Sequence, residues 1–177
     1  MEGLEGPSIG RLAEHIGMSK SGLYAHFRSK EELQLATIET ASEIFEVQVI
    51  RPTEAIESPL ARLEALCEGF LGHLEQKVFP GGCFFASAAA EFDTHPGPVK
   101  ERIALASREW LELLEELAAQ AQQDADLDQD EDAAQLAFEL DAYLLMGNTA
   151  FLLHNDPARL DQARAAVEAR LGRARPG

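Results

Sequence analysis

The chain has 177 residues and carries 15 Lys plus Arg against 31 Asp plus Glu, so its formal net charge at pH 7 is −16. This acidity excludes a generic nucleic-acid-binding surface, which is basic. The length and the 46% apolar content allow a sizeable core without metals or disulfides, and Cys67 and Cys83 form no close-spaced pair. No uncharged run is long enough to span a membrane, and the acidic start lacks the basic region of a signal peptide. We expect a cytoplasmic protein without a membrane contact.

The first 30 residues are the exception to the acidity. They hold four basic and three acidic groups, whereas the remaining 147 residues hold 11 basic and 28 acidic groups. Because the rest of the chain repels an anionic polymer, any such contact is expected through these 30 residues alone.

Two short helices are predicted in this segment. Ser8–Ile16 has apolar residues at helical spacing, Gly17 forms a tight turn, and Ser19 caps a second helix that reaches about Phe27. Two short helices joined by a glycine-containing turn form a helix-turn-helix unit. The outward face of the second helix carries small or hydrogen-bonding groups suited to a major groove, namely Lys20, Ser21, Gly22, Ala25 and His26, with Tyr24 to one side.

The middle of the chain predicts an all-α fold, because helix caps are frequent and strand-like alternation is absent. A capping box at Ser29 begins a helix that reaches about Ile50. The helices expected after it are, in chain order, Pro59–Val78, Cys83–Asp93 and Val99–Leu117.

The last two predicted helices are more apolar than one chain can easily cover. The segment from about 131 to 154 is apolar almost all round beyond Leu140, and Asp156 and Pro157 cap a final helix. A helix that is apolar on every side must be covered on every side, most simply by its own domain and a second copy of the chain. We therefore expect a homodimer through the helices near 131–154 and 157–171.

The expected organisation is a helix-turn-helix region with its connecting helix at 1–50 and a larger helical domain at 51–177. The tail at 172–177 is expected to fray. The acidic segment at 124–132 is interpreted as a solvated loop, because an EF-hand starting at Asp124 would need Gly and Glu where the chain has Gln129 and Gln135. No metal site and no cofactor are predicted.

A resemblance to the TetR/AcrR family of transcriptional regulators is carried by the stretch SIGRLAEHIGMSKSGLYAHFRSKEELQLA, which is similar to the family's DNA-binding segment. The later stretch GGCFFASAAAEFDTHPGPVKERI is similar to the C-terminal domain of one branch of the family. The resemblance implies a dimeric all-α repressor or regulator, in which a ligand in the larger domain changes the affinity for operator DNA. Residue by residue, it implies contacts to bases or the adjacent backbone by Lys20, Ser21 and Gly22, and to phosphates by Ser8, Tyr24, His26 and Lys30.

Elementary physics agrees with two of these roles. Lys30 opens a helix, whose unpaired N–H groups and dipole already favour an anion. Gly22 lets the backbone come close to a thymine methyl group. The alternative for Tyr24 and His26 is that they merely pack or lie in solvent.

The sequence departs from the family pattern at its start. Family members place a further helix before the segment that begins here at Ser8, and residues 1–7 leave no room for it. Leu12 and Phe27 then lose a cover, so we expect the first thirty residues to be the most mobile part of the structure. An alternative function is therefore a shortened, dimerising, ligand-binding protein that has lost sequence-specific DNA binding.

Candidate effector-binding residues lie on helices that are expected to face one another. In family members such helices line an effector pocket, and a pocket of these residue types suits a small apolar or aromatic effector. Each candidate is alternatively a plain core residue. The candidates are Phe70, His73, Phe84, Phe92, Trp110, Leu114 and Tyr143.

His73 needs a partner if its ring is buried, either Glu91 or a ligand. A metal or oxidant sensor built from His73 and the two cysteines is disfavoured, because no close-spaced ligand pair supports it. Catalysis is disfavoured as well. The compact set of Glu91, Asp93 and His95 lies where a helix ends, which favours capping and solvation.

Overall fold

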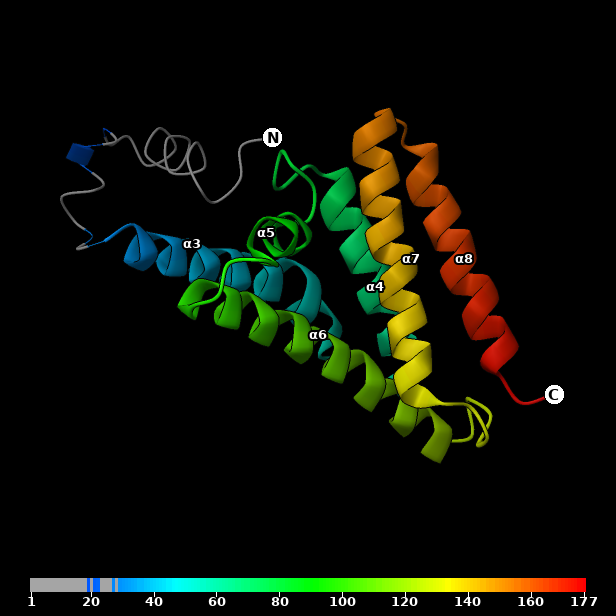
Figure 1. Cartoon of the computed structure of the whole chain (residues 1–177). Helices are drawn as coiled ribbons and strands as arrows, with labels where there is room; N and C mark the ends of the chain where they lie inside the picture. Colours follow the sequence, from blue (N-terminus) through cyan, green and yellow to red (C-terminus); the bar gives the residue numbers. More distant parts are fainter. Residues whose placement is uncertain (1–18, 20, 23–26, 28) are drawn as a thin grey trace. The chain divides into compact units, whose positions relative to one another are not determined.

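The computed structural model describes residues 19, 21, 22, 27 and 29–177. Throughout this part of the chain the regular structure is helical, which confirms the predicted fold class. The elements are α3 (Lys30–Phe45), the π-helix η1 (Glu46–Ile50), the 3-10 helix η2 (Arg51–Thr53), α4 (Pro59–Glu75), α5 (Phe84–Phe92), α6 (Pro98–Gln123), α7 (Ala133–His154) and α8 (Ala158–Ala174), shown in Figure 1. The helix predicted at Ser8–Ile16, most of the next one, and the mobility predicted for the first thirty residues lie outside the described residues.

Side-chain caps begin three of the helices, and the cap at Ser29 is the predicted one. The Ser29 hydroxyl accepts a hydrogen bond from the Glu32 N–H at 3.0 Å, and the Ser58 hydroxyl accepts one from the Ala61 N–H at 3.2 Å. Asp132 caps α7 in the same way. Each cap satisfies one of the N–H groups that a helix leaves unpaired in its first turn.

The helix predicted to run to Ile50 changes its hydrogen-bonding pattern before that residue. The α-helical part ends at Phe45, a single π-helical stretch continues it to Ile50, and Pro52 then lies in a 3-10 turn. Proline cannot donate the N–H bond that a continuing helix requires, so the helix stops here. Single π-helical turns occur often at functional sites.

The described residues up to Ile44 form a compact unit with Phe84–Ser107, whereas Phe45–Cys83 and Arg108–Gly177 form a second unit. This division differs from the expected boundary near residue 50. The reason is a hydrophobic core in the first unit, where α5 and the first part of α6 pack on α3. The core residues are Ile38, Ala88, Phe92, Val99 and Ile103.

An ion pair on the surface of the first unit also joins α6 to α3. The Arg102 guanidinium donates two hydrogen bonds to the Glu39 carboxylate, at 2.6 and 3.1 Å, and one to the Ser42 hydroxyl at 3.3 Å. The hydrogen bond from Arg102 lowers the pKa of Glu39. Because Glu39 is exposed, solvent screening leaves the pair a minor contributor to stability, and the apolar core provides most of it.

The second unit is built on α4, α7 and α8, which lie side by side in Figure 1. Gly147 allows α7 and α8 to approach closely, since a Cβ atom built on it would lie 2.7 Å from the Cβ atom of Ala163. Arg164 of α8 donates to Glu68 and Glu75 of α4 at 2.9 and 3.0 Å. The three helices are therefore held by close packing and by a network of ion pairs.

The end of the chain is more ordered than expected. Helix α8 reaches Ala174, which is buried, and the Ala174 carbonyl accepts a hydrogen bond from the Asp128 N–H at 2.8 Å. The prediction that fraying begins at Gly172 is therefore wrong for residues 172–174, because the acidic loop at 124–132 packs on this end of α8.

Helix α7 is long and apolar enough to cross a membrane, with 22 residues and a mean hydropathy of 1.3. Two charged residues, Glu139 and Asp141, interrupt its apolar run. In the structure α7 packs on both α4 and α8, as a core helix does, and its buried residues include Leu136, Leu140, Leu144 and Phe151.

Candidate functional site

Three of the predicted DNA-contact positions fall within the described residues. Ser21 and Gly22 are helical, and the Ser19 hydroxyl accepts a hydrogen bond from the Gly22 N–H at 3.0 Å, which is the predicted cap. The Ser21 side chain is exposed, so it is available to a partner. The remaining positions, Ser8, Lys20, Tyr24 and His26, lie outside the described residues.

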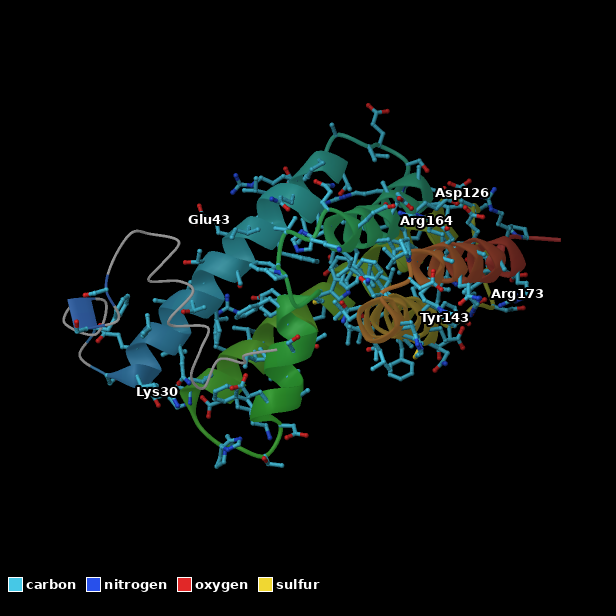
Figure 2. All side chains as sticks on the ribbon, turned by 90° about the horizontal axis from the view of Figure 1, so that it is seen from above. Lys30, Glu43, Asp126, Tyr143, Arg164 and Arg173 are labelled. Carbon is cyan, nitrogen blue, oxygen red and sulfur yellow. The ribbon has the colours of Figure 1, made fainter. Side chains whose placement is uncertain are left out.

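Lys30, the third of these positions, is the first residue of α3 (Figure 2) and is exposed. The helix N-terminus favours an anion, whereas Glu31 and Glu32 in the same turn oppose one. Whether this helix end attracts a phosphate therefore depends on the Lys30 ammonium group, which makes Lys30 the natural residue to test.

Three of the seven predicted effector residues meet in the second unit. Phe70 and Trp110 are stacked, with 6.0 Å between their ring centroids and 28° between their planes. Phe45 lies edge-on to both rings and to His73, at centroid distances of 6.1, 5.3 and 5.9 Å respectively. Phe79 completes the group, 5.5 Å from His73. We call Phe45, Phe70, His73, Phe79 and Trp110 the aromatic cluster.

The other four predicted effector residues lie elsewhere. Phe84 packs against the core of the first unit, and Phe92 belongs to that core. Leu114 is fully buried in α6, and Tyr143 projects from α7 (Figure 2) into a different depression of the second unit. The predicted set of seven therefore contains one ring cluster and several residues with separate roles.

His73 is buried and has a partner other than the predicted Glu91. Its Nδ1 atom lies 3.0 Å from Oε1 of Gln48, which belongs to η1, whereas Glu91 belongs to the other unit. Burial lowers the pKa of His73, so the neutral ring is favoured. In that form Nδ1–H donates to the Gln48 oxygen, and the hydrogen bond ties η1 to α4 beside the cluster.

Asp141 of α7 is the polar residue at the cluster. Its Oδ1 atom accepts a hydrogen bond from Nε1 of Trp110 at 3.0 Å. The carboxylate is half-buried, and this burial raises the pKa of Asp141, while the hydrogen bond from Trp110 opposes the rise. In the sequence, Asp141 is one of two acids in a mostly apolar helix.

Cys67 behaves as a packed thiol. It is buried, and burial together with the negative charge of Asp141 raises the pKa of the thiol to about 12. A thiol this weakly acidic supplies almost no thiolate at neutral pH, so it is a poor nucleophile and a poor metal ligand.

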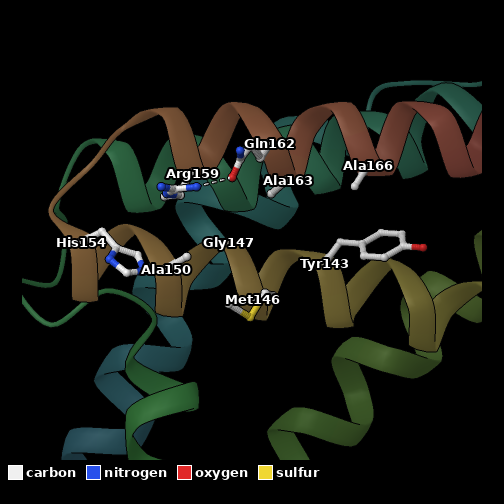
Figure 3. Close-up of a pocket in the computed structure, with 9 residues that line it drawn as sticks. All are labelled: Tyr143, Met146, Gly147, Ala150, His154, Arg159, Gln162, Ala163 and Ala166. Carbon is white, nitrogen blue, oxygen red and sulfur yellow. Dashed lines mark hydrogen bonds between the residues drawn. The ribbon is translucent and has the colours of Figure 1, made fainter.

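A depression of about 270 Å³ lies over the contact of α7 with α8 (Figure 3). Its walls include Tyr143, Met146 and Ala150 from α7 and Gln162 from α8. Met146 is 61% exposed, and α7 carries two further exposed apolar side chains, Phe138 and Leu153, at 62% and 77%. We call Phe138, Met146 and Leu153 the apolar face of α7.

Comparisons with known proteins match both parts of the chain. Residues 2–37 match the family described as bacterial regulatory proteins, tetR family, and residues 59–167 match the tetracyclin repressor-like C-terminal domain. The nucleoid occlusion factor SlmA of Marinomonas sp. (strain MWYL1) is 33% identical over 79 residues, which are 45% of this chain and 39% of that relative. The match thus spans less than half the length of this curated relative.

Solved structures share the fold over nearly the whole chain. A TetR transcriptional regulator from Chloroflexus aurantiacus J-10-FL has a TM-score of 0.85 at 22% identity, over 96% of this chain and 85% of that one. AibR, solved in complex with isovaleryl coenzyme A and operator DNA, has a TM-score of 0.71 at 23% identity, over 98% of this chain and 89% of that one. At these identities the likeness shows the fold alone.

Proposed function

Because the chain belongs to the TetR family of bacterial regulatory proteins, we propose that it is a dimeric transcriptional repressor whose affinity for operator DNA is controlled by a small molecule. The observation that carries this proposal is the presence of both family segments in one chain, at 2–37 and 59–167. The protein acts in the cytoplasm, where its operator lies. We propose no catalytic role, since the His95 ring at the end of α5 lies 3.1 Å from the backbone oxygen of Glu91, as a capping side chain does.

DNA is bound through the first thirty residues, which carry no net negative charge. Lys20, Ser21 and Gly22 contact bases or the adjacent backbone, and Ser8, Tyr24, His26 and Lys30 contact phosphates. The exposure of Ser21 and Lys30 supports these roles. The acidic remainder repels DNA and so confines the contact to this segment.

The dimer forms through α7 and α8. The apolar face of α7 and the depression beside it support this interface, because exposed apolar side chains of this size are otherwise costly in water. A two-fold axis then sets two recognition helices about one turn of DNA apart, roughly 34–36 Å.

The effector binds at the aromatic cluster and acts through α3. This helix begins at Lys30, a proposed phosphate contact, and ends at Phe45, a member of the cluster. A ligand that separates Phe45 from Phe70 and Trp110 displaces the end of α3 and hence changes the spacing of the two DNA-binding segments. The ligand must bind the two arrangements unequally, since otherwise it shifts no equilibrium.

Fluorescence anisotropy tests the DNA-binding step. The full chain is titrated onto labelled DNA from upstream of its own gene and onto a scrambled control, at two salt concentrations. We expect tighter binding to the natural sequence and an affinity that falls steeply with salt.

A pair of charge-matched variants locates the contact. Lys30→Gln is expected to weaken binding to both DNAs and to reduce the salt slope by about one per subunit. Arg173→Gln removes the same charge from an exposed position near the end of α8 and should leave binding unchanged. If the chain dimerises yet binds both DNAs equally, it is instead a dimerising, ligand-binding protein without sequence-specific DNA binding.

A further inference from the structure

Asp141 is a half-buried acid without a cationic partner. Its hydrogen-bond partner is the indole N–H of Trp110, a neutral donor, and within the described part of the chain no Lys, Arg or His side chain forms an ion pair with it. Arg164, the cation that joins α8 to α4, is committed to Glu68, Glu75 and Asp161. A carboxylate removed from water without a cation is unfavourable.

The surroundings of Asp141 supply apolar and π surface rather than positive charge. Trp110 donates to the carboxylate from α6 and stacks on Phe70 of α4, while Phe45 at the end of α3 meets both rings edge-on. His73 supplies no charge, since its buried ring is held by Gln48 and burial favours its neutral form. Trp110 and Asp141 are both half-buried, so solvent reaches each of them.

A desolvated acid beside stacked aromatic rings has the complementary chemistry of an organic cation. The faces of Trp and Phe rings attract positive charge, and a carboxylate accepts a charge-assisted hydrogen bond from an ammonium or amidinium group. Neither feature is needed to bind a neutral apolar molecule, for which an apolar residue at position 141 would serve better.

We propose that the effector of this protein is an organic cation, with its positively charged nitrogen against the Asp141 carboxylate and its apolar or aromatic body on Trp110, Phe70 and Phe45. The proposal rests on the proposed function, because it specifies the chemical class of that effector. It also gives a role to an acid that lies half-buried in the middle of a mostly apolar helix. The cation supplies the partner that the folded chain lacks.

The test uses Trp110, the one tryptophan of the chain, as an intrinsic fluorescent reporter. Three probes of matched shape are titrated at neutral pH, namely phenylpropylamine as the cation, phenylpropanol as the neutral form and phenylpropanoate as the anion. We expect the amine to bind about tenfold or more tightly than the alcohol, as a charge-assisted hydrogen bond with a cation–π contact implies, and the anion to bind most weakly.

Asp141→Asn keeps an oxygen that accepts from Trp110 and removes the charge, so the preference for the amine over the alcohol should disappear. Asp126→Asn makes the same chemical change in the exposed acidic loop, and the preference should survive. Equal affinities for amine and alcohol in the unmodified chain overturn the proposal, and so does a failure of the amine to bind at millimolar concentration.

These outcomes are independent of the DNA-binding experiment, which contains no ligand. A chain that binds its operator and prefers the alcohol refutes the proposal of a cationic effector but leaves the proposed DNA-binding function standing. A chain that prefers the amine and binds no operator supports the cation site and refutes the DNA-binding regulator. The selectivity of the unmodified chain alone decides the matter if Asp141→Asn does not fold.

Discussion

His73 and Asp141 respond to the same burial in opposite directions. Removal from water favours the neutral form of each group, so it lowers the pKa of the histidine and raises the pKa of the acid. His73 therefore contributes little positive charge to the aromatic cluster. Asp141 ionises there at a free-energy cost, because its charged form is partly removed from water. This asymmetry is the residue-level basis of the preference for a cationic ligand.

Burial of His73 also makes folding sensitive to pH. Because the pKa of His73 is lower in the folded protein than in the unfolded chain, where it is about 6.5, the unfolded chain binds more protons below that pH. The contribution of His73 to stability is therefore present above pH 6.5 and is lost as the pH falls toward the folded-state pKa. We expect the midpoint temperature of thermal unfolding to decrease as the pH is lowered from 7.5 to 5.

His73→Phe separates this contribution from the rest of the acid response. Phenylalanine retains ring contacts with Phe45 and Phe79 but takes up no proton, so the fall in unfolding temperature should become shallower. His154→Gln replaces an exposed histidine and is the matched control, expected to keep the slope of the unmodified chain. Identical slopes for His73→Phe and the unmodified chain would contradict the role assigned to His73.

Helices α7 and α8 are held together where a glycine faces an alanine. Gly147→Ala places a methyl group 2.7 Å from the Cβ atom of Ala163, which is closer than two carbon atoms pack. Overpacking of this kind costs about 1–3 kcal/mol, partly offset by about 1 kcal/mol from the higher helix propensity of alanine. Chemical denaturation should therefore show a net loss of stability.

The double variant Gly147→Ala, Ala163→Gly moves the methyl group to the other helix and restores the space. We expect it to be more stable than the sum of the two single changes predicts, by about 1 kcal/mol, as coupled neighbours are. Gly172→Ala is the control, because nothing lies within 4 Å of its added Cβ atom, and it should leave stability unchanged or higher. Strict additivity at 147 and 163 would show that the two helices do not meet there.

Local signals allowed most elements to be predicted. The caps at Ser29 and Ser58 act within four residues of chain, so the sequence displays them directly. The π-helical turn at the end of α3 contacts His73 of α4 through Gln48, and Ala174 bonds to Asp128, both far away in sequence. The packing of 84–107 on α3 within the first unit is likewise non-local. Spacing along one helix carries no information about such partners.

The same limit applies to the candidate site. Phe70, His73 and Trp110 are large residues on regular apolar stripes, which is why they could be selected. Phe45 ends α3, Phe79 lies in the turn after α4, and Asp141 is one of two acids in a mostly apolar helix. Their importance therefore emerges only from the ring contacts and the hydrogen bond to Trp110. A polar residue in an apolar helix was the one available signal for Asp141.

The apolar face of α7 predicts that the molecule is a dimer. Met146→Glu places a charge in this face without disturbing the core, since the side chain is 61% exposed. A change at the centre of an interface commonly costs 2 kcal/mol or more, so we expect dimer affinity to fall by roughly thirtyfold or more. Sedimentation velocity across a concentration series measures the change, and circular dichroism should show unchanged helicity.

Leu105→Glu is the matched control, because Leu105 is 40% exposed on α6 and lies outside the apolar face of α7. It should sediment as the unmodified chain does. A Met146→Glu chain that remains dimeric would place the interface elsewhere on the molecule.

DNase I footprinting of the region upstream of its own gene tests whether this chain is a dimer that reads DNA through its first thirty residues. We expect one protected stretch made of two inverted half-sites whose centres lie about one helical turn apart, roughly 34–36 Å. The protection should fade when the salt concentration is raised and in the Lys30→Gln chain. A uniform cleavage pattern at protein concentrations at which the chain is dimeric would contradict the claim.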